Sequence, residues 1–374
     1  MSKIFDFIIV GGGIAGTTLA NNLKTPNYLL LESTNRLGGR IFSKKVGNNI
    51  IEYGAKWIHG DVPNFPEENL EYIIEENIND MQKIKIVDVN ISEKSIYSIL
   101  NKYRRATYSN KKKFCESLEM NNDEKEIIDN IFAEDFGEHI CKISQSNKNF
   151  KIYNGYNKRI TNGYSNIIQK KQINYKLNSR VKIIKKNNNF WEVFTRKKSY
   201  LCKKLILAVP LNIVKNRFSN LLTERKLTIL NKLEMGKINI LVLFFDKIFW
   251  DKETTFWFSR KYPNIVVVNG LNNVLYMKEF STQKMNKTNY LKYLSHFFPK
   301  YKLPTNIIVQ NWNKQKDIQG SWTYHKQNIT KKELVELTEP ENNIGLIGEY
   351  LSTNRWGTTD GAYFSAIKYS KKYT

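Results

Sequence analysis

Residues 5–23, FDFIIVGGGIAGTTLANNL, limit the possible folds of this chain more than any other stretch. An apolar run reads as a buried strand, and a helical pattern follows a glycine-rich turn. Gly11, Gly13 and Gly16 stand at G-x-G-x-x-G spacing. In this motif the first glycine permits a tight turn, the second lets the backbone approach a pyrophosphate, and the third allows close packing of helix on strand. The stretch predicts a strand–turn–helix unit whose helix N-terminus binds a dinucleotide.

A second strand with an acidic end supports this prediction. The run YLLLE ends at Glu32, at the kind of distance from the glycine turn where an acidic residue takes the ribose hydroxyls. The stretch STNRLGGRIFS follows directly, and its glycine pair and Arg40 suit a second close approach to phosphate. The alternative for Glu32 is a surface carboxylate at a strand end.

This order of motifs resembles the FAD-binding half of the flavin amine oxidases. The next stretch, EYGAKWIHG at 52–60, is similar to the family's following segment in the form seen in polyamine oxidases. The resemblance implies contacts with FAD from Gly11, Gly13, Ala15, Gly16, Glu32, Arg36, Gly39, Arg40, Gly54, Ala55, Lys56 and Trp57.

Later segments follow the family order, at 161–169, 205–215, 235–250, 311–324 and 344–370. The resemblance implies that the backbone of Val181 meets the adenine and that Glu349 holds the ribityl chain. It also implies that the backbone N–H of Thr359, at a helix start, faces the pyrimidine end of the flavin. A helix N-terminus there stabilises the negative charge that develops on reduction.

The resemblance also implies a substrate pocket beside His59. This histidine either binds a substrate nitrogen or takes a proton, or it is a hydrogen-bonded core residue. Trp322 matches the aromatic position flanking the flavin face, and Thr358 matches the second such position. Ser321 stands where monoamine oxidases carry a flavin-linked cysteine, so non-covalent FAD is expected.

The strand after Met235-Gly236 departs from the family pattern. Most members have a lysine four residues past this glycine, where it assists the reaction with oxygen, and this chain has Ile240. Lys237 does not take its place, because it lies an odd number of residues from Ile240 and side chains at odd separations in a strand point to opposite faces. We therefore expect slow oxidase turnover. Asp360 and Ala366 also replace common family residues.

The acidic segment PEENLEYIIEENIND, residues 66–80, shows helical spacing of its apolar residues. The spacing predicts an amphipathic helix with Leu70, Ile73, Ile74 and Ile78 on one face and Glu68, Glu71 and Glu75 on the other. Its acidic face is either plain solvated surface or a local acidic region that draws in polyamines.

Composition restricts the partners. The net charge of +24 is spread along the chain, and the clusters at 111–113 and 196–198 are short, so nucleic acid would bind only through the basic surface. The three cysteines are widely spaced and predict neither disulfides nor a metal site. No apolar run reaches the roughly 20 residues of a membrane span. We expect a soluble cytoplasmic protein.

The expected fold class is α/β, with α+β character in a second domain. A Rossmann-like FAD-binding domain of the glutathione-reductase type should use residues 1–59, 155–233 and 339–374. A substrate domain with a mixed sheet and helices should use 60–154 and 234–338.

The leading hypothesis is an FAD-dependent amine oxidase that transfers a hydride from a polyamine or similar amine to flavin N5, with oxygen as acceptor. One alternative is another flavin oxidoreductase of this fold, such as an amino-acid oxidase or a desaturase. The other is a flavin-binding protein with little catalysis. The sequence leaves open which amine and which carbon react, the role of residues 81–130, and the oligomeric state.

Overall fold

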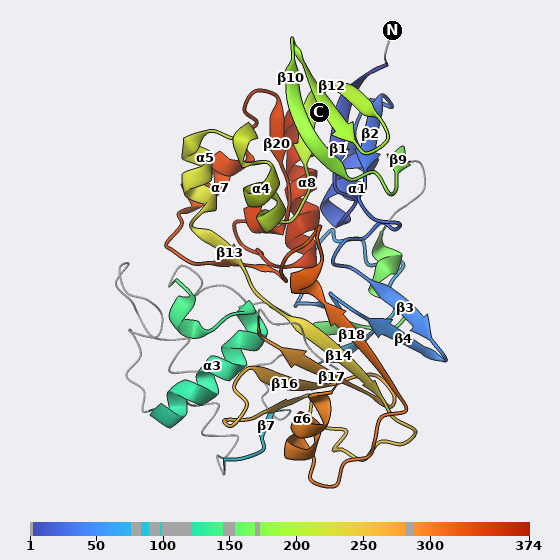
Figure 1. Cartoon of the computed structure of the whole chain (residues 1–374), viewed down its shortest axis with the longest axis vertical. Helices are drawn as coiled ribbons and strands as arrows, with labels where there is room; N and C mark the ends of the chain where they lie inside the picture. The colour runs from blue at the N-terminus through green and yellow to red at the C-terminus, as the bar shows by residue number, and fades with distance from the viewer. Residues whose placement is uncertain are drawn as a thin grey trace.

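The fold is known from a computed structural model of the chain (Figure 1). It describes residues 3–75, 84–89, 98, 122–144, 154–168, 173–281 and 288–374. The predicted features at 76–80 and 111–113 lie outside these described residues.

The first layer is a seven-stranded sheet with helices packed on it. Its strand order is β10-β11-β12-β1-β2-β9, and the seventh strand, β20, pairs with β12. Strands β2, β1, β12 and β20 are mutually parallel where they pair, while β10, β11 and β12 form an antiparallel meander. The strands are β1 (Ile4–Val10), β2 (Tyr28–Leu31), β9 (Tyr175–Lys176), β10 (Val181–Asn187), β11 (Phe190–Thr195), β12 (Ser199–Leu207) and β20 (Ile344–Leu346).

Three distant parts of the sequence therefore build this one sheet. Helix α1 (Ile14–Asn22) leads from β1 towards β2, and it packs against α8 (Thr359–Tyr373) near the end of the chain. Figure 1 draws both helices beside the sheet, the first blue and the second red. The predicted α/β fold class with a Rossmann-like sheet is confirmed.

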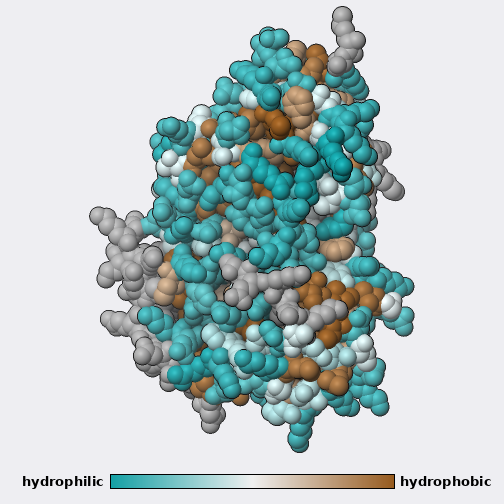
Figure 2. Space-filling view, in the orientation of Figure 1, coloured by the Kyte–Doolittle hydropathy of each residue, from teal (hydrophilic) through white to brown (hydrophobic). Residues whose placement is uncertain are grey.

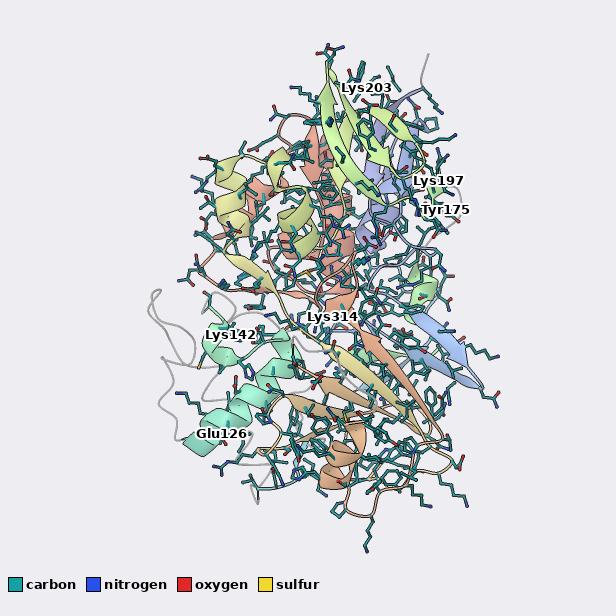
Figure 3. The ribbon with its side chains drawn as sticks, viewed as in Figure 1. Glu126, Lys142, Tyr175, Lys197, Lys203 and Lys314 are labelled. Atoms are coloured by element: carbon teal, nitrogen blue, oxygen red, sulfur yellow. The ribbon has the colours of Figure 1, made fainter. Side chains whose placement is uncertain are left out.

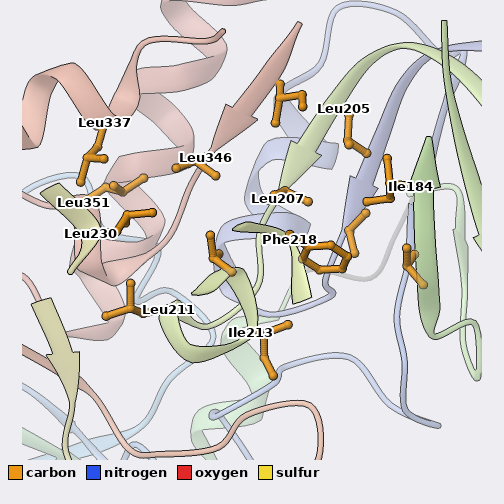
Figure 4. Packing of buried hydrophobic residues seen from close by; sticks show 14 of the residues in the cluster. Ile184, Leu205, Leu207, Leu211, Ile213, Phe218, Leu230, Leu337, Leu346 and Leu351 are labelled. Atoms are coloured by element: carbon orange, nitrogen blue, oxygen red, sulfur yellow. The ribbon is translucent and has the colours of Figure 1, made fainter. Parts of the chain in front are cut away.

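On the other face of the meander, α4 (Leu211–Arg217), α5 (Glu224–Leu230) and α7 (Lys331–Thr338) bury leucine and isoleucine side chains against β12 and β20. Figure 4 shows this packing, with Leu205 and Leu207 facing the helices. This closely packed core holds β12 and β20 in place.

The second layer is a six-stranded sheet of order β18-β14-β17-β16-β15-β7, drawn in the lower half of Figure 1. All its pairings are antiparallel except that of β7 with β15. The strands are β7 (Ile84–Ile86), β14 (Asn239–Phe244), β15 (Phe256–Phe258), β16 (Ile265–Asn269), β17 (Val274–Glu279) and β18 (Asn306–Asn311). Helix α3 (Asn122–Phe136) packs against β15 and β16, and α6 (Tyr290–Phe297) adds Leu294 and Phe297 to the core beneath the sheet.

Short strands connect the two layers. The small sheets are the hairpin of β3 (Ser43–Val46) with β4 (Asn49–Glu52), the pair β13 (Leu233–Met235) with β19 (Thr323–His325), and a three-stranded sheet of β5 (Trp57–Ile58), β8 (Asn157–Ile160) and β6 (Tyr72–Glu75). Trp57 of β5 packs beside Phe256 of the second sheet, and Ile58 belongs to the core next to β1 and β2, so the stretch predicted to line the pocket sits where the layers meet.

The helix predicted over 66–80 is wrong for its described part. Residues 72–75 form the edge strand β6, which pairs with β8. Leu70 is buried, but Ile73 and Ile74 are 41% and 65% exposed, so no single apolar face packs on the core. The β-branched and aromatic residues of this segment favour a strand, and pairing with β8 outweighs the helical spacing.

Hydrophilic side chains cover most of the face shown in Figure 2. The cluster at 196–198 is exposed in the turn between β11 and β12, where Figure 3 labels Lys197. Among the described residues, no helix has both the length and the apolar character that crossing a membrane requires.

Candidate functional site

One cavity of about 330 Å³ runs from the first glycine turn to the second sheet. It receives residues from the β1–α1 turn, the end of β2, the start of β5, the end of α3, β14, β17 and the start of α8. Of the predicted site residues it is lined by Gly11, Gly13, Ala15, Glu32, Arg36, Gly39, Arg40, Gly54, Ala55, Lys56, Trp57, His59, Val181, Trp322, Glu349, Thr358 and Thr359. Gly16 is the predicted residue that is not in this lining.

The glycine turn has three distinct geometries. Gly11 has a φ of +107°, a conformation that side-chain-bearing residues rarely adopt. At Gly16 an added Cβ would lie 2.0 Å from the carbonyl oxygen of Gly11, so this position requires glycine for packing. At Gly13, by contrast, an added Cβ would meet nothing within 4 Å. The turn is therefore tight towards the protein and open towards the cavity.

Glu32 is fixed by the turns around it. Its Oε2 accepts the N–H of Gly12 at 2.7 Å, and its Oε1 accepts the N–H of Thr34 at 2.8 Å and the hydroxyls of Ser33 and Thr34. A carboxylate oxygen accepts about two hydrogen bonds, so Oε2 keeps a free acceptor position beside the cavity. The side chain is 6% exposed, which excludes the interpretation as a surface carboxylate.

The second glycine pair lies directly on the first turn, because the N–H of Gly38 donates to the carbonyl of Gly12 at 2.8 Å. Arg36 shapes this loop from within. Its guanidinium donates to the carbonyls of Ile41 at 3.0 Å and Gly39 at 2.7 Å and stacks 3.9 Å from the ring centre of Phe42.

Arg40 and Glu349 join the two ends of the chain. The Nη1 of Arg40 lies 2.9 Å from Oε1 of Glu349 and also donates to the carbonyl of Ser321. Glu349 in turn accepts the hydroxyl of Thr323 at 2.9 Å and the N–H of Gly357 at 3.0 Å. The buried carboxylate is thus held by three donors from three different segments.

The start of α8 is capped from its own loop. The Thr358 hydroxyl accepts the N–H of Gly361 at 3.0 Å and donates to the carbonyl of Arg355 at 2.7 Å. Arg355 pairs with buried Asp360 and donates to the carbonyl of His59 at 2.6 Å. The His59 segment and the first turn of α8 are therefore fixed to each other.

Aromatic rings dominate the far end of the cavity. The rings of Trp57 and Phe256 lie with centroids 6.3 Å apart, and the ammonium of Lys56 lies 4.2 Å from the centre of the Trp57 ring. The indole N–H of Trp322 donates to the carbonyl of Asp135 at 2.8 Å, which fixes this ring against the end of α3. His59 is partly buried in the same wall.

Ile240, at the position where the resemblance leads us to expect a lysine, lines the cavity, and a lysine enters the cavity from the next strand. Lys278 on β17 is the direct partner of Ile240 in the antiparallel ladder, and opposite residues share a face. Both line the cavity, and Lys278 is 6% exposed. Its ammonium forms an ion pair with Glu134 from α3.

The sequence interpretation missed Lys278 and Glu134. The available signals were a lysine inside the apolar strand VLYMKE and the acidic pair in AEDF at the end of a helix. Neither signal identifies its partner, because the pairing of β14 with β17 is not written in either segment.

Comparisons with known proteins identify the family and the fold. Residues 118–371 match the family model for flavin containing amine oxidoreductase, and residues 9–67 match that for an NAD(P)-binding Rossmann-like domain.

Among individual proteins, the chain is 22% identical to polyamine oxidase 2 of Arabidopsis thaliana over 425 aligned residues, which cover 96% of this chain and 86% of that protein. It is 35% identical to nicotine dehydrogenase of Pseudomonas putida over 97 residues, 25% of this chain and 20% of that protein. The fold is similar to that of putrescine oxidase bound to putrescine, with a TM-score of 0.75, 14% identity and 99% coverage of both chains.

Proposed function

Because the chain belongs to the family of flavin-containing amine oxidoreductases, we propose that it is an FAD-dependent oxidase of polyamines or similar amines. The observation that carries this proposal is the continuity of one cavity, which joins a dinucleotide-type glycine turn to an aromatic chamber that contains His59. A cofactor at one end and a small substrate at the other would share that space.

The residues present fit FAD in three respects. Gly13 leaves open space on the cavity side, and as the N-cap of α1 it has no side chain to occupy the helix N-terminus. Both features suit a pyrophosphate. The remaining acceptor position on Glu32 suits a ribose hydroxyl. The Arg40–Glu349 pair, whose carboxylate is buried, lines the cavity and suits the ribityl chain.

We propose that FAD is bound non-covalently, since Ser321 has no sulfur to form the link found in monoamine oxidases. The bound flavin would supply the hydride acceptor. The chain's own residues would then orient the amine. The faces of Trp57 and Trp322 restrict its position, and His59 binds a nitrogen or holds a proton near neutral pH.

The electron acceptor is a separate part of the proposal. Relatives include proteins named as oxidases and as a dehydrogenase, so family membership leaves the acceptor open. We propose oxygen, because Lys278 brings an ammonium into the cavity beside Ile240 and a cation there favours the negative charge that reduced oxygen carries.

The test is an anaerobic titration of protein reconstituted with FAD. Spermine, spermidine, their N-acetylated forms and simple amines are added in turn while the flavin absorption band is recorded. Bleaching by at least one polyamine, reversed by air, is expected. Protein that takes up no FAD, or flavin that no amine bleaches, would overturn the proposed function.

A further inference from the structure

The ion pair of Glu134 with Lys278 is built into the cavity wall. Glu134 comes from the last turns of α3 and Lys278 from β17, and their side chains are 12% and 7% exposed. The Lys278 ammonium donates to Oε1 of Glu134. Both residues line the cavity next to the aromatic rings.

The other carboxylate oxygen of Glu134 lacks a donor. Oε2 is buried and has no hydrogen-bond partner within the described part of the chain. Buried carboxylate oxygens are normally satisfied, because a charged acceptor removed from water without a donor is costly. The cavity borders this residue, so a ligand in the cavity is in a position to supply the donor.

The surroundings indicate which kind of donor fits. The faces of aromatic rings attract cations, and Trp57 already has the ammonium of Lys278 at 5.5 Å from its ring centre. Two carboxylates, Glu134 and Asp135, and two ammonium groups, Lys56 and Lys278, line this part of the cavity. Since these charges balance, selection depends on the unfilled acceptor rather than on a general negative potential.

We propose that Glu134 binds a charged nitrogen of the substrate that is not the reacting one, so that the enzyme selects diamines and longer polyamines over monoamines. This inference rests on the proposed amine oxidase function. The reacting nitrogen must be neutral for hydride loss from its neighbouring carbon, whereas a carboxylate oxygen in the cavity wall holds an ammonium. One substrate therefore carries both nitrogens, and Lys278 keeps the carboxylate oriented towards the second one.

The test compares Glu134→Gln with Glu126→Gln. Glu126 lies on the same helix but is exposed and paired with Arg260, outside the cavity lining. Each variant is assayed with 1,4-diaminobutane against butylamine and with 1,8-diaminooctane against octylamine. The unmodified enzyme should prefer the diamine of at least one pair. In Glu134→Gln this preference in kcat/KM should fall by about tenfold to a hundredfold, the range for hydrogen bonds to charged groups. In Glu126→Gln it should be unchanged.

A binding measurement separates recognition from turnover. The dissociation constant of 1,8-diguanidinooctane, measured by calorimetry, should rise at least about tenfold in Glu134→Gln. The FAD content of the variant should stay close to that of the unmodified enzyme, because the amide keeps the shape of the side chain. Its melting temperature should fall, because the buried Lys278 loses its anion, so binding is measured at a temperature where the variant is folded. A purely structural role would lower the FAD content together with binding.

The inference is overturned if the diamine preference and the diguanidine affinity are both unchanged in a variant that retains FAD. If Glu134→Gln does not fold, Glu134→Asp takes its place, because it keeps the charge but moves the acceptor back by one methylene. An unchanged diamine preference in Glu134→Asp also overturns the inference. Failure of every amine to bleach the flavin of the unmodified enzyme is a different result, because it overturns the proposed function itself.

Discussion

The two ends of the cavity are built in different ways. At the dinucleotide end, Glu32 and Glu349 are held by hydrogen bonds to backbone N–H groups and to neighbouring side chains. At the aromatic end, the wall contains large rings and an ion pair in which one oxygen of Glu134 has no donor among the residues that the structure describes. The dinucleotide end is therefore shaped by backbone groups. The aromatic end instead presents side chains, and we propose that a ligand donates to the open acceptor on Glu134.

The largest effect should follow from substitutions in the glycine turn. In Gly16→Ala the new methyl group would lie 2.0 Å from a backbone oxygen, so strand and helix must separate. We expect a loss of at least about 3 kcal/mol of stability, with little folded protein recovered.

Gly13→Ala is the matched control, because its methyl group enters open space. We expect this variant to fold with a normal melting temperature in the absence of FAD but to bind FAD far more weakly. Circular dichroism melting of the apoprotein and a fluorescence titration with FAD measure the two quantities. Normal FAD affinity in Gly13→Ala would show that the cofactor does not approach the turn at this residue. The glycine turn would then not be the part of the cavity that is shaped for a dinucleotide.

The second largest effect should come from the aromatic end. Lys278→Met leaves the Glu134 carboxylate buried without its cation, and breaking a buried pair costs roughly 3 kcal/mol. Addition of a diamine should restore part of this stability, because ligand binding to the folded state raises its free energy of unfolding. The thermal shift produced by 1,4-diaminobutane should therefore be larger in the variant than in the unmodified enzyme.

Lys203→Met is the control for this experiment. Lys203, labelled in Figure 3, forms an exposed pair with Asp6, and such surface pairs contribute little. Equal melting temperatures for the two variants would mean that the Glu134–Lys278 pair carries no stabilisation, contrary to the structure.

The same contrast explains how much the sequence could predict. Gly12 and Glu32 are 20 residues apart and belong to one strand–turn–helix–strand unit, so their spacing alone indicates the contact. Glu134 and Lys278 are 144 residues apart, and their contact depends on the register of β17 against β14 and on the packing of α3. Local motifs record the first kind of contact, whereas tertiary packing decides the second.

The resemblance to amine oxidases bridged some of these distances, since it indicated that the start and the end of the chain share one cavity. The helix predicted over 66–80 came from apolar spacing and not from the resemblance, and it is wrong for the described residues 72–75, which pair with β8 as a strand. The resemblance drew attention to Ile240, but the pairing of Ile240 with Lys278 on the neighbouring strand depends on a register that one segment cannot reveal.

A smaller, pH-dependent effect is expected at Glu52, a buried carboxylate outside the cavity lining. Burial raises the pKa of Glu52, at the end of β4, from 4.5 to about 7, although hydrogen bonds from Tyr164 and Ser43 and the charge of Lys56 act in the opposite direction. Between pH 4.5 and about 7 the folded protein retains a proton on Glu52 that the unfolded chain has lost. Unfolding then releases that proton, so stability falls as the pH rises.

Glu52→Gln removes this ionisation and keeps an acceptor for the same donors. We expect the fall in stability between pH 5 and pH 8 to shrink by roughly 2–3 kcal/mol, since one pKa unit corresponds to about 1.4 kcal/mol and part of the change lies below pH 5. Urea unfolding at pH 5, 6, 7 and 8 measures the slope. An unchanged slope would mean that Glu52 is ionised in the folded state throughout this range.

The smallest effect concerns Thr358, which was predicted to stand beside the substrate and also caps α8. Both hydrogen bonds of its hydroxyl stay within its own loop and helix. Thr358→Ala should therefore cost about 1 kcal/mol of stability, as the loss of an N-cap does, while Thr358→Ser should keep the cap. If the hydroxyl serves only the helix, KM for diamines should be the same in both variants and in the unmodified enzyme. A rise in KM for Thr358→Ala without a fall in its melting temperature would show that the hydroxyl contacts the substrate. Thr358 would then belong to the residues that bind the amine and not to those that only hold the start of α8.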